Sequence, residues 1–211
     1  MKKILITLFV FTYSFALTSF AYASEDVEKY VHEVVSKTIN ILDDSSINIS
    51  EKKKKLRALM KENIDIDYIS KKILLRHKNT ISDEEFEEFK TTYEKYLISS
   101  FLQLVKRYKG QRFKIKSFEK VYEGSYIVRG KLVDSNNKSF DVDYLVRYHN
   151  NQWLVFDMIT AGVSLLSTHK SEFNSILQNK GIKKLISDLQ SKDKSKITSP
   201  VNIPQNKEKQ Q

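Results

Sequence analysis

The sequence contains no cysteine, which excludes disulfides, thiolate nucleophiles and thiolate metal sites. Proline is almost as scarce, and its two positions, Pro200 and Pro204, both lie in a polar C-terminal stretch. The four histidines are scattered, no two of them are four residues apart, and no HExxH, Walker or GxSxG motif occurs. These absences argue against a metal centre and against a triad hydrolase.

Long hydrophobic runs are missing except at the very start of the chain. Two lysines precede an apolar stretch over residues 4–20, and Ala21-Tyr22-Ala23 then supplies the small-x-small pattern that signal peptidase reads. We predict that residues 1–23 are a signal peptide, cleaved before Ser24. A retained membrane anchor is the alternative, but no basic stop-transfer cluster follows Ala23.

The remaining length suits a single domain with its own core. We predict a domain over residues 24–190 and a disordered basic tail over residues 191–211, where the chain is polar. The net charge of +10 suggests anionic membranes or acidic partners. A composition rich in Lys, Ile and Asn, as an AT-rich genome produces, explains the same excess. The charge alone therefore assigns no function.

Apolar residues recur at intervals of three and four in the first half of the chain. This spacing predicts helices over residues 27–42, 50–64, 68–75 and 82–108. Ser50 is expected to cap the second helix. Ser82 and Glu85 form a capping box at the head of the longest helix, which Gly110 is expected to end.

After Gly110 the apolar period changes from helical to alternating. Strands are expected to start near Phe113, Tyr126, Phe140 and Trp153, joined by short turns, which predicts an antiparallel meander of four. Two further helices, separated at Gly181, close the domain. The predicted fold class is α+β, with helices packed on one face of a curved four-stranded antiparallel sheet.

The stretch from Trp153 to Ser164, WLVFDMITAGVS, resembles a hallmark of the MlaC family of periplasmic phospholipid-transport proteins, also called the toluene-tolerance family. The resemblance extends over residues 26–189. One departure is Leu74-Leu75-Arg76-His77, where the family often has a Leu-Gly pair followed by an aromatic residue. This departure concerns the local helix end and leaves the resemblance intact.

The resemblance implies a periplasmic phospholipid carrier with a lipid-sized hydrophobic cavity, no cofactor and no catalytic residues. Its implied partners are an outer-membrane lipoprotein complex and an inner-membrane complex of MCE-domain and ABC-transporter subunits. Nucleic acid is not expected as a partner, because the exported chain would not meet it.

A lipid carrier needs an apolar cavity, and the alternating strands offer candidates for its wall. The residues expected to line the cavity are Leu97, Phe101, Leu104, Phe113, Ile115, Val128, Leu132, Val142, Tyr144, Val146 and Trp153. The same alternation would also produce a filled core, so the sequence leaves core and cavity lining as alternatives for each of them. Trp153 in particular is as well explained by packing as by contact with acyl chains.

Three polar or small residues near the end of the last long strand invite functional interpretations. We expect Asp157 to accept hydrogen bonds from the backbone where strand gives way to helix, and Ser164 to cap the helix that follows. Gly162 is expected to provide an unusual backbone conformation.

Two other functions remain as alternatives. The first is an exported enzyme with a cone-shaped α+β fold, acting on a small apolar substrate, which would require a buried acid or base with a displaced pKa. Asp141 and Asp143 alternate with the apolar residues of their strand, so we expect them to point away from the pocket. The second is an exported adaptor with a completely filled core.

Overall fold

The computed structural model describes residues 26–104 and 108–194. The predicted signal peptide, residues 105–107 of the predicted longest helix, and residues 195–211 of the predicted tail lie outside the described residues. Within the described ranges, no helix has the length and hydrophobicity that crossing a bilayer requires.

The helices follow the predicted order. They are an N-terminal helix over residues 26–43, α2 (Ile49–Asn63), α3 (Ile66–Leu74) with a short 3-10 turn (Leu75–His77), α4 (Asp83–Leu104) and α5 (Leu165–Lys194). The capping box is confirmed, because Glu85 N donates to Ser82 Oγ and Ser82 N donates to Glu85 Oε2, both at 3.2 Å. The Ser50 cap was wrong. Asn48 caps α2 instead, and its side chain accepts a hydrogen bond from Glu51 N at 3.0 Å. The helix therefore begins at Ile49, an exposed residue that lies outside the apolar stripe from which the helix was predicted.

The last helix is divided at Gly181, as predicted. This glycine has φ +76°, in the left-handed region that disfavours other residues, and it kinks α5 into two helical segments. The second segment continues to Lys194, so the first four residues of the predicted tail are helical.

The sheet is an antiparallel meander. Its strands are β1 (Arg112–Tyr122), β2 (Ser125–Val133), β3 (Ser139–His149), β4 (Gln152–Thr160) and β5 (Val163–Ser164), and each pairs with the next. The fifth strand is a difference from the prediction of four. It forms because Ala161 and Gly162, with φ +50° and +79°, make a tight hairpin turn that folds two residues back onto β4. Two residues are too few to produce an alternating pattern.

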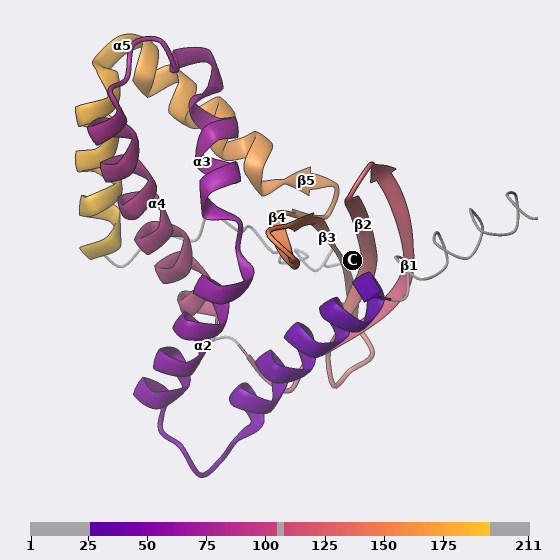
Figure 1. The fold of residues 1–211 in the computed structure, drawn as a ribbon. Coiled ribbons are helices and arrows are strands. Elements are labelled where there is room, and N and C mark those ends of the chain that lie inside the picture. Colours follow the sequence, from indigo (N-terminus) through magenta and orange to yellow (C-terminus); the bar gives the residue numbers. More distant parts are fainter. Residues whose placement is uncertain (1–25, 105–107, 195–211) are drawn as a thin grey trace, which may run out of the picture.

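The two faces of the sheet differ sharply. One face carries Tyr126, Val128 and Val146, which pack with Val27 and Val31 of the N-terminal helix. That helix, indigo in Figure 1, lies against the sheet, whereas α2, α3 and α5 contact the sheet mainly through β4.

The other face of the sheet is charged. Asp143 pairs with Arg129 and Asp141 pairs with Lys116, at 3.4 and 3.0 Å. Asp143 therefore lies on the charged side, as expected, whereas Asp141 pairs there and also borders the cavity described below.

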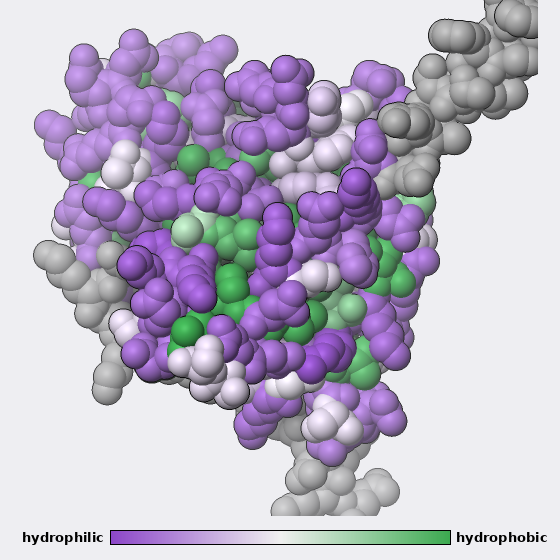
Figure 2. Space-filling model, turned by 60° about the horizontal axis from the view of Figure 1, so that its bottom comes forward, coloured by the Kyte–Doolittle hydropathy of each residue, from purple (hydrophilic) through white to green (hydrophobic). Residues whose placement is uncertain are grey.

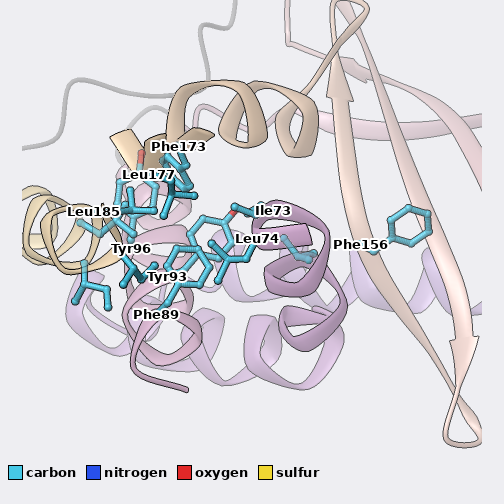
Figure 3. Packing of buried hydrophobic residues seen from close by; sticks show 13 residues of the cluster. Ile73, Leu74, Phe89, Tyr93, Tyr96, Phe156, Phe173, Leu177 and Leu185 are labelled. Carbon is cyan, nitrogen blue, oxygen red and sulfur yellow. The ribbon is translucent and has the colours of Figure 1, made fainter. Parts of the chain in front are cut away.

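A second core holds the helices together. Phe89 and Tyr93 of α4 stack with ring centroids 5.6 Å apart, and Phe173 of α5 meets both rings edge to face. Figure 3 shows these rings between α3, α4 and α5. Phe156 of β4 belongs to the same cluster and packs edge to face against Tyr68 of α3. The cavity described next lies between this core and the sheet, and Tyr93 of the core also borders it.

Candidate functional site

A cavity of about 450 Å³ lies between the apolar face of the sheet and the helices. Bulges in β1 and β4 interrupt the pairing, and bulges bend strands, which helps to curve the sheet away from the helical layer. The N-terminal helix, α2 and α4 supply the facing wall. The volume is in the range of small-molecule and cofactor pockets.

Many of the apolar side chains that line this cavity are only half-buried. Ile39 and Leu97 from the helices and Phe113 and Tyr144 from the sheet all belong to this group. Figure 2 shows hydrophobic residues gathered in a hollow on one face, surrounded by hydrophilic ones. Large apolar surfaces of this kind usually mark a binding site for an apolar ligand.

The inner end of the cavity contains a buried polar pair. Tyr93 Oη lies 2.8 Å from His169 Nδ1, and the imidazole stacks on Phe173 with centroids 5.2 Å apart. His169 is 0 % exposed, and burial lowers its pKa to about 4. Burial also raises the pKa of Tyr93. Both side chains are therefore neutral at neutral pH, although no residue in the described part of the chain pairs with His169 Nε2.

Sequence reasoning missed His169 because the histidines were considered only as pairs with one another. The signal was its spacing on the helix. His169 lies four residues after Leu165 and four before Phe173, so all three lie on the same apolar face of the helix. This spacing predicts that His169 is buried.

Other polar groups at the cavity are already satisfied or uncharged. Tyr30 Oη donates to Asn63 O at 3.3 Å, and burial raises the pKa of Tyr144 to about 12. In the described ranges, no three acidic or histidine side chains come together as a metal site would require. Two carboxylates also border the cavity, but Asp157 accepts hydrogen bonds from Met158 N, Leu166 N and Ser164 Oγ, and Asp141 pairs with Lys116. The rest of the wall is apolar or uncharged.

The expected structural roles of the residues around the end of β4 are confirmed. Asp157 Oδ1 accepts hydrogen bonds from Met158 N at 2.8 Å and Leu166 N at 2.9 Å, and Asp157 Oδ2 accepts from Ser164 Oγ. Ser164 Oγ in turn accepts from Ser167 N and so caps α5. Asp157 therefore joins the end of the sheet to the start of the helix.

The structure divides the predicted wall residues into two groups. Six line the cavity: Leu97, Phe101, Phe113, Leu132, Val142 and Tyr144. Four others pack in the cluster beneath the N-terminal helix instead: Ile115, Val128, Val146 and Trp153. The side chain of Leu104 lies outside the described part of the chain. Contact of any of these residues with lipid stays a prediction.

The largest part of the wall that sequence reasoning missed is the N-terminal helix. It lines the cavity with Val31, Val34, Val35, Thr38, Ile39 and Leu42. Their helical spacing was visible in the sequence, but nothing in that spacing said which surface they face.

The absence of a side chain at Gly130 leaves room for the ring of Phe113, a residue of the cavity wall. A Cβ atom added at Gly130 would lie 2.2 Å from Cζ of Phe113, whose ring lies edge to face against Tyr144. We expect Gly130→Ala to displace this ring and to lower the free energy of unfolding by about 1–3 kcal/mol in denaturant titrations. In a Phe113→Leu background the cost should shrink. If Gly130→Ala destabilised the Phe113→Leu protein as much as the wild type, the clash with the Phe113 ring would not be the cause of the destabilisation.

Comparison with known proteins agrees with this architecture. A family model described as "MlaC protein" matches residues 32–191. The "Intermembrane phospholipid transport system binding protein MlaC" of Haemophilus influenzae is 24% identical over 197 residues, covering 90% of this chain and 92% of the relative.

A solved structure shares the fold. It is a phospholipid-binding protein from Ralstonia solanacearum in complex with a phospholipid, with a TM-score of 0.68 and 17% identity, covering 78% of this chain and 94% of the other. The family model matches well over half of the sequence, and the chain belongs to the MlaC family.

Proposed function

We propose that this protein is a periplasmic carrier that binds the acyl chains of a phospholipid in its cavity and moves the lipid between two membranes. The proposal rests on one observation, the apolar cavity between helices and sheet. The similar Ralstonia protein, solved with a phospholipid, and the name of the Haemophilus relative support the choice of ligand.

Energetics favour a carrier that releases its lipid only at a membrane or partner. Two acyl chains contain on the order of 30 methylenes, and at about 0.8 kcal/mol each their transfer from water approaches about 25 kcal/mol. This upper bound exceeds the practical affinity ceiling of about 21 kcal/mol, and although cavity costs and incomplete burial reduce it, release into water stays strongly unfavourable. Transfer between cavity and bilayer is nearly balanced, because the chains are buried in both.

The proposed partners follow from the family. They are an outer-membrane lipoprotein complex and an inner-membrane complex of MCE-domain and ABC-transporter subunits. The predicted signal peptide over residues 1–23 would deliver the protein to the periplasm, where both complexes are reachable.

A catalytic role is the rival function, and the Tyr93–His169 pair is the observation that favours it. A histidine with a pKa of about 4 is a weak base at neutral pH, and Tyr93 already occupies its Nδ1. Asp157, a carboxylate that also lines the cavity, already accepts hydrogen bonds from Met158 N and Leu166 N. We therefore propose that the protein is not an enzyme.

Gentle purification from the periplasm, followed by lipid extraction and mass spectrometry, tests the proposal directly. We expect about one phospholipid for each protein molecule. Labelled lipid should stay bound in buffer and move only when acceptor vesicles or partner complexes are added. A protein that comes away free of lipid, or that releases lipid rapidly into buffer, would overturn the proposal.

A further inference from the structure

Two lysines lie directly opposite each other on the outer, charged face of the sheet. Lys114 of β1 and Lys131 of β2 are register partners. Like charges in this position destabilise a sheet. A locally unfavourable pair that persists in a folded protein often marks a functional surface.

Within the described ranges, neither lysine belongs to a close ion pair, but Lys131 faces Asp141 across the β2–β3 pair, and, after the hydrogen bond from Lys116, its positive charge helps to lower the pKa of that carboxyl. Lys116, next along β1, pairs with Asp141 at 3.0 Å, and Arg112 pairs with Asp43 at 2.9 Å. Among the residues with described side chains, none forms an ion pair or a side-chain hydrogen bond with Lys114 or Lys131. We call Arg112, Lys114, Lys116 and Lys131 the basic stripe. Its four positive charges face only two carboxylates, Asp43 and Asp141, and Lys114 is the least compensated of the four.

The basic stripe lies beside the cavity. Phe113 and Leu132 are the sequence neighbours of Lys114 and Lys131, they pair with each other in the sheet, and both line the cavity from the opposite face. β1 is also an edge strand, so no further strand of the sheet lies beyond it. Contact of a partner with the stripe would therefore hold the cavity close to that partner.

We propose that the basic stripe binds the anionic phospholipid head groups of a bilayer surface, and thereby brings the cavity next to the membrane. The binding of head groups by the stripe does not depend on the carrier function. Only the purpose of that binding, which is to bring the cavity next to the membrane, rests on it. The centres of protein–protein interfaces are rich in aromatic residues and poor in lysine. The exposed apolar residues of β1, Val121 and Tyr122, are at the far end of the strand. Lysine-rich surfaces without such anchors suit head-group phosphates better.

A lysine on an edge strand can also serve to prevent pairing with another sheet. This role would account for Lys114. It does not account for Lys131, because β2 lies between β1 and β3 and has no free edge. The experiment separates the two roles.

The test compares binding of the mature protein to vesicles of phosphatidylcholine alone and of equal parts phosphatidylcholine and phosphatidylglycerol, by co-sedimentation. Lys114→Gln/Lys131→Gln should weaken binding to the anionic vesicles by about fivefold for each lysine, and high salt should weaken the wild type similarly. The matched control is Lys180→Gln/Lys183→Gln, which removes two exposed charges from α5 and should leave binding unchanged.

Three outcomes would overturn the proposal. They are an equal loss in both variants, no preference of the wild type for anionic vesicles, and self-association of the stripe variant with vesicle binding retained. Lipid extraction from the same samples keeps the two hypotheses apart. A stripe variant that no longer binds vesicles but still contains phospholipid supports the stripe proposal without affecting the carrier function. A wild-type protein that contains no lipid contradicts the carrier function and leaves the stripe proposal untouched.

A charge reversal gives a second, independent readout. Lys114→Glu would face Lys131 with an opposite charge, and we expect the midpoint of thermal unfolding to rise by about 2 °C while binding to anionic vesicles falls below that of Lys114→Gln. A variant that unfolds at a higher temperature and keeps its vesicle binding would contradict the proposal.

Discussion

Replacing Ile39 by glutamate is expected to lower the amount of co-purified phospholipid by at least about tenfold, because a bound acyl chain would cover an unpaired carboxylate. Ile39 lines the cavity from the N-terminal helix and is only half-buried. In the empty cavity the new carboxylate can stay hydrated, so the fold should tolerate it. The measurement is mass spectrometry of extracted lipid, with thermal unfolding recorded on the same preparation.

Two variants control this experiment. Asn40→Glu adds the same carboxylate to the exposed side of the same helix and should keep its lipid. Ile39→Met keeps an apolar side chain of similar volume at the wall and should also keep it. Loss of lipid in Asn40→Glu equal to that in Ile39→Glu would show that charge on this helix, and not the cavity wall, is responsible.

Acidification is expected to destabilise the protein through His169. Its pKa is about 4 in the folded chain, because burial disfavours the charged form, against an ordinary value of 6.5. Between these values the unfolded chain binds the proton more readily, so stability rises with pH across this window. It is fully present above about pH 6.5 and falls by about 3 kcal/mol as the pH drops to about 4.

Denaturant titrations between pH 4 and 7 measure this contribution. His169→Gln should flatten the pH dependence by most of that amount, since glutamine does not titrate and can still bond to Tyr93 Oη. His149→Gln, at an exposed position, should leave the slope as it is in the wild type. Equal slopes in His169→Gln and the wild type would mean that the buried imidazole does not resist protonation.

The elements of the fold could be predicted because their signals are local. The Ser82–Glu85 capping box, the break at Gly181 and the Asp157–Ser164 connection each depend on residues within a few positions of one another. Helical and alternating periods depend on the chain's own geometry and need no knowledge of the partner layer. The start of α2 and the two-residue β5 escaped, because neither contains enough periodic residues to be recognised.

By itself, then, the sequence determined the order of helices and strands, the apolar face of the sheet and the resemblance to the MlaC family. Only the tertiary structure decided which apolar residues border empty space. Val128 and Leu132 alternate identically on β2, yet Val128 is 0 % exposed beneath the N-terminal helix and Leu132 lines the cavity. Alternation specifies the face a side chain occupies, whereas the distance to the opposing layer depends on strand bending and on where distant helices come to rest.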